Sequence, residues 1–219
     1  MIVPNLKLKR GLKTASFFVG LCLKCFDMKY IFVISSLFLF LTSCSADKRY
    51  EVGQILIPKG EILVWLNEQT PNHKASFIEL ANRGYWDSLT FNRVIPDFVA
   101  QAGCPDTPEG FNDPEYLLEP EFNEKLTHAY GAFGAGRDGN PDKLSARCQF
   151  YIVQNKEGEH RLDGDYAVYG KVIKGMDLVD TMVSVPRDSL NEPLTPITMD
   201  VNILLMTPED LQAYDVELN

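Results

Sequence analysis

The segment FNRVIPDFVAQAG, residues 91–103, decides the fold of this chain. It joins two strand-like runs, Ser88–Val94 and Val99–Ala102. Gln101 is unusual in such a strand, because a buried polar group without a partner costs ~1–3 kcal/mol. Arg93 carries a guanidinium that stays charged at all relevant pH and presents its donors in a rigid fork. Taken alone, it would more often be a surface arginine in an ion pair, so its role depends on the rest of the chain.

Around this segment the pattern predicts many short strands and few helices. Apolar residues alternate on both sides of Pro58-Lys59-Gly60, which predicts a β-hairpin. Phe77, Leu80 and Ala81 recur at helical spacing within residues 70–81, and a second helical stretch follows Gly175 at 176–183. Further strands are expected at 149–154, 167–173 and 198–206. Such a composition favours a closed or sandwiched β architecture.

The first residues have the layout of a secretory signal. Lys24 and Lys29 precede an apolar run over residues 30–41, which is followed by Leu41-Thr42-Ser43-Cys44. The run is shorter than the ~20 residues of a membrane-spanning helix. A buried core helix is the alternative, but the four residues ending at Cys44 resemble a bacterial lipobox at every position. We therefore expect a signal peptide over 1–43, with a true start possible at Met28, and an acylated Cys44.

This interpretation divides the chain and gives it a location. We expect the lipidated cysteine and a tether at 44–53, the folded domain at 54–206, and a C-terminal tail at 207–219. The acyl chains would anchor the protein in the membrane of the cell envelope. Ser45 and Ala46 follow Cys44 without an aspartate, which favours the outer membrane, facing the periplasm.

Charge argues against one class of partner. Residues 1–43 hold six basic residues and one acidic residue, so the remaining chain has 15 basic and 29 acidic residues, a net charge of −14. Such a surface repels phosphate backbones, and we expect no nucleic acid partner.

Several blocks together resemble the cyclophilins, a family of peptidyl-prolyl cis–trans isomerases. Residues 91–103 match the family's Phe-His-Arg-x-Ile-Pro-x-Phe-x-x-Gln-Gly-Gly motif, except chiefly at Asn92. Similar blocks follow in family order at 131–137, 148–153, 161–172 and 175–180. The resemblance covers about residues 54–206. It implies a mostly β fold, a closed eight-stranded antiparallel barrel capped by two α-helices. It also implies a monomer without a cofactor that binds proline-containing peptides or unfolded segments.

The chemistry explains why an arginine would matter. Rotation about an X–Pro bond passes through a twisted amide, with a barrier of ~18–20 kcal/mol, and is slow without help. No bond is broken, so a site needs only to bind the twisted form best. The prolyl nitrogen then regains a lone pair, and a fixed cationic donor stabilises that state. The resemblance assigns this role to Arg93.

The same resemblance implies the remaining site residues. Phe98 and Gln101 would act with Arg93 as catalytic residues. The substrate would be bound by Phe150, Leu162, Tyr166, Ala135, Gly136 and Arg137.

Several of these positions depart from the common pattern. Tyr166 stands where many members have histidine, and Ala135 is smaller than the usual methionine. Arg161 occupies the place of a tryptophan, Gly136 replaces alanine and Arg137 replaces asparagine. These changes bear on the substrate preference rather than on the catalytic group.

The cysteines and histidines complete the candidates. Cys104 and Cys148 are an even pair in a compartment that permits disulfides, and the loops bearing them could meet near the groove; two buried thiols are the alternative. His73, His128 and His160 lack ligand-like spacing, so no metal is expected.

Three functions are compatible with these features. The first is an isomerase that assists the folding of exported proteins, and the retained Arg93, Phe98 and Gln101 favour it. The second is a catalytically weak module that binds proline peptides in a changed groove. The third, a structural envelope lipoprotein, is supported by Cys44 alone.

Overall fold

The computed structural model describes residues 48–104, 116–216 and 218, so the expected signal peptide and Cys44 lie outside the described residues. Most of the described chain is β-structure. The strands are β1 Tyr50–Ile57, β2 Gly60–Leu66, β3 Arg93–Val94, β4 Val99–Gly103, β5 Leu117–Leu118, β6 Ala132–Ala135, β7 Ser145–Ala146, β8 Gln149–Val153, β9 Val168–Lys174 and β10 Asp200–Met206. The helices are α2 Pro71–Asn82, α4 Met176–Val183 and α5 Pro208–Gln212, with a 3-10 turn at His160–Leu162.

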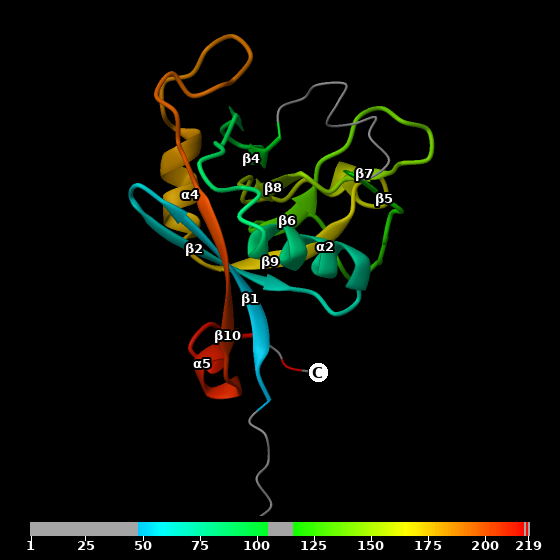
Figure 1. Ribbon diagram of the computed structural model, residues 1–219. Helices are drawn as coiled ribbons and strands as arrows, with labels where there is room; N and C mark the ends of the chain where they lie inside the picture. Colours follow the sequence, from blue (N-terminus) through cyan, green and yellow to red (C-terminus); the bar gives the residue numbers. More distant parts are fainter. Residues whose placement is uncertain (1–47, 105–115, 217, 219) are drawn as a thin grey trace, which may run out of the picture. The chain divides into compact units, whose positions relative to one another are not determined.

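Eight of these strands form one antiparallel sheet in the order β10-β1-β2-β9-β6-β8-β4-β3 (Figure 1). β5 and β7 form a separate pair. The two outermost strands of the large sheet also approach each other, because Thr90 and Thr198 form an isolated antiparallel bridge just before β3 and β10. The backbone N–H of Phe91 donates to the carbonyl of Ile197 at 3.0 Å beside it. The expected eight antiparallel strands are therefore present.

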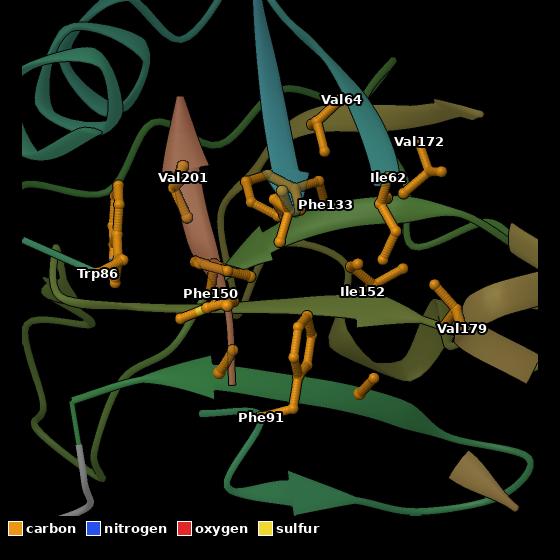
Figure 2. Packing of buried hydrophobic residues seen from close by; sticks show 14 of the residues in the cluster. Ile62, Val64, Trp86, Phe91, Phe133, Phe150, Ile152, Val172, Val179 and Val201 are labelled. Atoms are coloured by element: carbon orange, nitrogen blue, oxygen red, sulfur yellow. The ribbon is translucent and has the colours of Figure 1, made fainter. Parts of the chain in front are cut away.

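The core is built largely from aromatic rings. Phe133 and Phe150 lie with their ring centroids 4.8 Å apart, and Phe77 and Trp86 are separated by the same distance. Figure 2 shows Phe150 among Phe91, Phe133 and Trp86, with aliphatic side chains from several strands and from α4 around them. These rings contribute much of the buried apolar area that stabilises the sheet.

The expected hairpin and both expected helices are confirmed. β1 and β2 pair antiparallel around the turn, with Ile57 opposite Gly60. α2 and α4 occupy the two segments with helical spacing, and they bury Phe77 and Leu80 from α2 and Val179 and Met182 from α4.

The structure extends the domain at both ends of the range expected from sequence. β1 begins at Tyr50, inside the expected tether, because Val52 is fully buried and Tyr50 pairs with Met206. The expected tail contains α5, whose first turn has a capping box between Thr207 and Asp210. Leu211 from this helix is fully buried and packs with Val52. No helix within the described ranges is both long and apolar enough to cross a membrane.

A buried histidine attaches α2 to the segment between β5 and β7. His73 lies 2.6 Å from Glu121 through Nδ1 and 3.0 Å from the Ser145 hydroxyl through Nε2. Glu121 also accepts the backbone N–H groups of Asn72 and His73, which satisfies donors in the first turn of α2. Burial lowers the pKa of His73, although the hydrogen bond to Glu121 opposes this effect. His73 is therefore a neutral structural link between two elements.

Candidate active site

A surface cavity of about 210 Å³ lies on the outer face of the sheet, beside β3, β4 and β8. Strand alternation explains which side chains reach it. Val99 and Gln101 of β4 line the cavity, whereas Ala100 and Ala102 join the core. The lining residues are Arg93, Phe98, Val99, Gln101, Gly136, Arg137, Gln149, Tyr151, Arg161, Leu162 and Tyr166.

Arg93 is held at this cavity by neutral groups. β3 and β4 pair with Arg93 opposite Gln101, and Nη1 of Arg93 donates to Oε1 of Gln101 at 3.2 Å. The guanidinium carbon lies 5.7 Å from the centroid of the Phe98 ring. Within residues 48–104 and 116–216, Arg93 forms no ion pair with a carboxylate. Its charge therefore remains available to a ligand in the cavity.

A series of hydrogen bonds between side-chain amides holds Gln101 in place. Nε2 of Gln101 donates to Oε1 of Gln149 at 3.4 Å, and Nε2 of Gln149 donates to the carbonyl of Cys104 at 2.7 Å. Cys104 forms a disulfide with Cys148, the residue before Gln149, so the expected pairing is present in the structure. The disulfide joins the ends of β4 and β8, and it keeps this series of hydrogen bonds together.

Apolar and aromatic groups, together with further polar and charged ones, form the rest of the cavity. Phe98, Leu162 and Tyr166 lie at the lining positions expected for them. Gly136 and Arg137, which follow β6, lie there too. The structure thus brings together Arg93, Gln101 and these five residues from three separate sequence blocks.

Two expected pocket residues lie elsewhere. Phe150 is fully buried in the core on the opposite face of the sheet (Figure 2). Ala135 is almost fully buried and belongs to the same core. The expectation was wrong for Phe150 by one position, because successive residues of a strand point to opposite faces. Tyr151, its neighbour, lines the cavity instead. Ala135 pairs with Phe150 across β6 and β8, so the two face the core together.

Tyr151 is the main residue that the sequence analysis missed, and a polar chain fixes it. Its hydroxyl lies 2.7 Å from Nε2 of His128, and Nδ1 of His128 lies 2.6 Å from Oδ1 of Asp163. Since a carboxylate can only accept, Nδ1 carries the proton and Nε2 accepts the hydroxyl of Tyr151. A Cβ at Gly134 would collide with the Tyr151 ring, so this position on β6 requires glycine.

The pKa shifts of Tyr151, His128 and Asp163 agree with these proton positions. Burial raises the pKa of Tyr151 well above 10, so its phenol is a neutral donor. Burial also lowers the pKa of His128, against the opposing effect of Asp163, so the imidazole is neutral. Burial acts to raise the pKa of Asp163, but the hydrogen bonds from the side chain and backbone of His128 outweigh it, and the pKa is lowered. Asp163 is therefore a carboxylate.

Comparisons with known proteins agree on one family. The model of the cyclophilin type peptidyl-prolyl cis-trans isomerase family matches residues 52–202. Peptidyl-prolyl cis-trans isomerase B of Bacillus subtilis is 40% identical over 116 residues, which cover 52% of this chain and 77% of the relative. A peptidyl-prolyl cis-trans isomerase of Acinetobacter baylyi is 33% identical over 138 residues, covering 60% of this chain and 72% of the relative.

A solved structure supports the fold. The crystal structure of a cyclophilin type peptidyl-prolyl cis-trans isomerase from Cryptosporidium parvum, determined in the presence of the dipeptide Ala-Pro, superposes with a TM-score of 0.62. It is 23% identical, and the match covers 71% of this chain and 99% of that one. The fold is therefore of the cyclophilin class. With the family model matching most of its length, the chain belongs to the cyclophilin-type peptidyl-prolyl cis–trans isomerase family.

Proposed function

We propose that this protein accelerates the cis–trans isomerisation of X–Pro bonds in exported proteins, and that Arg93 stabilises the twisted amide. One observation carries the proposal. The guanidinium of Arg93 lies at an open cavity and, among the residues that the structure describes, is held by the neutral amide of Gln101 rather than by a carboxylate. A cationic donor in this setting stabilises the prolyl nitrogen only when that nitrogen has regained its lone pair.

The rest of the cavity would hold the peptide. Phe98, Leu162 and the Tyr151 ring provide an apolar surface for the proline ring, and Gln101 would both orient Arg93 and bind the substrate backbone. The presence of Ala-Pro with the structurally similar Cryptosporidium parvum protein supports a proline-containing ligand. No cofactor has a part in this mechanism.

The location and the complete architecture are also part of the proposal. Residues 1–43 would be removed as a signal peptide, and acylated Cys44 would anchor a monomer in the cell envelope, with the outer membrane facing the periplasm favoured. The eight-stranded sheet would close into a barrel, a closure that the bridge between Thr90 and Thr198 supports. Metabolic labelling with a fatty acid tests the anchor, since Cys44→Ser should abolish the label.

Substitution of Arg93 tests the activity. A charge-assisted hydrogen bond contributes ~1.5–3 kcal/mol, so Arg93→Ala should lower kcat/KM about 10- to 150-fold in a protease-coupled isomerisation assay. Arg83→Ala is the control, because this arginine pairs with Glu79 at the exposed end of α2. Equal rates for the wild type and Arg93→Ala would instead support the catalytically weak peptide-binding module.

A further inference from the structure

The cavity has an unusual balance of charge. Arg93, Arg137 and Arg161 line it, whereas no aspartate or glutamate of the described residues does so. The whole chain carries a net charge of −9, with 30 acidic residues against 21 basic ones. A cationic groove in an acidic protein focuses the local field on anionic ligands and repels cationic ones.

The guanidinium of Arg161 is fixed at the edge of the cavity. Its central carbon lies 4.9 Å from the centroid of the Phe98 ring, and its side chain is 65% exposed. Nε donates to Oε2 of Glu159 at 3.0 Å. The carboxylate of Glu159 is buried and also accepts from Nδ2 of Asn155 at 2.9 Å. Glu159 therefore offsets one of the three positive charges and leaves the exposed edge of Arg161 toward the solvent.

The guanidinium of Arg137 is held by neutral acceptors. Its central carbon lies 4.4 Å from the centroid of the Tyr166 ring. Nε donates to the carbonyl of Asp165 at 2.9 Å, and Nη1 donates to the carbonyl of Asp138 at 2.8 Å. The carboxylate of Asp165 pairs with Lys143 instead. Arg137 is thus positioned by backbone carbonyls, and the Asp165 carboxylate, which also interacts with it, is hydrogen-bonded chiefly to Lys143.

We propose that this groove selects proline segments that carry a carboxylate side chain next to the proline, and that Arg137 and Arg161 set the preference. The inference rests on the proposed function in that it uses the same groove, but it concerns binding and does not require turnover. Both guanidiniums are oriented by an aromatic face and by hydrogen bonds, so little side-chain entropy is lost when they meet an anion. A bound carboxylate would gain a bidentate partner that a neutral amide could not match.

Direct binding measurements test this preference. Three dye-labelled peptides of one length would carry Glu-Pro-Glu, Gln-Pro-Gln or Lys-Pro-Lys, so that both sides of the proline are covered. Fluorescence anisotropy with the purified protein at low salt should give the Glu peptide about fivefold tighter binding than the Gln peptide, the upper range for one exposed ion pair. The Lys peptide should bind more weakly than both. The ratio should approach one at ~1 M salt, where the Debye length is about 3 Å.

Variants assign the preference to the two arginines. Arg137→Gln/Arg161→Gln should bring the Glu-to-Gln ratio close to one, whereas Arg137→Lys/Arg161→Lys should keep most of it, because the charge is retained. Arg83→Gln is the matched control and should leave the ratio unchanged, since Arg83 does not line the cavity. If the Gln variant fails to fold, the salt titration and the Lys variant still decide the matter.

The outcomes separate this inference from the proposed function. Tighter binding of the Glu peptide without isomerisation would support the charge preference and contradict the catalytic role of Arg93. Isomerisation with equal binding of the Glu and Gln peptides would overturn the charge preference but still support the proposed isomerase activity. A preference that persists at high salt, or that survives in the double Gln variant, would also overturn it, as would failure to bind any of the peptides.

Discussion

The hydrogen bond between Tyr151 and His128 should contribute far more to the free energy of unfolding than a hydrogen bond between exposed side chains, because both groups are buried. His128 has no exposed surface and Tyr151 retains 5%. Tyr151→Phe would leave Nε2 of His128 without a donor, and His128→Leu would leave the Tyr151 hydroxyl without an acceptor. A buried polar group without a partner costs ~1–3 kcal/mol, so each single change should lower the free energy of unfolding by about 2 kcal/mol. For a domain of this size that corresponds to a Tm lower by roughly 4–8 °C.

The double variant provides the sharper measurement. Tyr151→Phe/His128→Leu removes both polar groups, and Asp163 stays solvated because 30% of its side chain is exposed. Its cost should therefore be about 1–3 kcal/mol less than the sum of the single costs.

Urea unfolding followed by tryptophan fluorescence gives all four free energies. Tyr130→Phe is the control, since its hydroxyl donates to Asp180 at 3.2 Å in a partly exposed position and should change stability by less than ~0.5 kcal/mol. Costs of the two single changes that add within ~0.5 kcal/mol would refute the reasoning.

Three further predictions concern pH, the disulfide and one glycine. Burial lowers the folded-state pKa of His73 and His128, so the unfolded chain binds protons first below pH ~6.5; stability should be complete above that pH and fall as the solution becomes more acidic. The lowered pKa values of Glu121 and Asp163 act in the same direction at lower pH, so a urea midpoint that is higher at pH 5.5 than at pH 7.5 would contradict this account. The disulfide between Cys104 and Cys148 spans 44 residues, for which the loss of loop entropy in the unfolded chain gives about 4 kcal/mol. Reduction should therefore lower the free energy of unfolding by roughly 2–4 kcal/mol, and a urea midpoint that does not change with reductant would contradict this prediction. Gly134→Ala should displace the Tyr151 ring and weaken both stability and peptide binding. Gly139→Ala is the control and should change neither, because a Cβ there would meet nothing within 4 Å. Equal Tm values and equal peptide affinities for the two variants would contradict the predicted collision.

The parts of the fold that sequence predicts well have one buried and one exposed face. α4 exposes Thr181 while it buries Val179 and Met182, so its spacing reveals a helix. The hairpin of β1 and β2 has a Pro/Gly turn between two alternating runs. β6 carries neither signal, because all four of its residues are buried and glycine and alanine dominate the segment.

The same reason explains the error at Phe150. Every residue of β8 is buried, so no alternation of polar and apolar residues tells which of two adjacent aromatic side chains faces the core. Tyr151 could have been favoured only by its hydroxyl, which needs a polar partner when buried.

The candidate site was predictable where its residues are close in sequence. Arg93, Phe98 and Gln101 come from a single turn and the two strands beside it, so one motif places all three. His128 and Asp163 reach Tyr151 from separate segments, and no local pattern predicts their contacts.

The pairing of β1 with β10 has a consequence for how the molecule is made. Tyr50, near the start of the described chain, is matched to Met206, near its end. A ribosome releases the polypeptide from the amino terminus onward, so β1 cannot pair with β10, and this edge stays uncovered, until the chain has been synthesised through Met206. Contacts this distant along the chain slow folding and prolong exposure to aggregation. A member of a family that accelerates slow folding steps in other proteins thus has a late folding step itself, the pairing of β1 with β10.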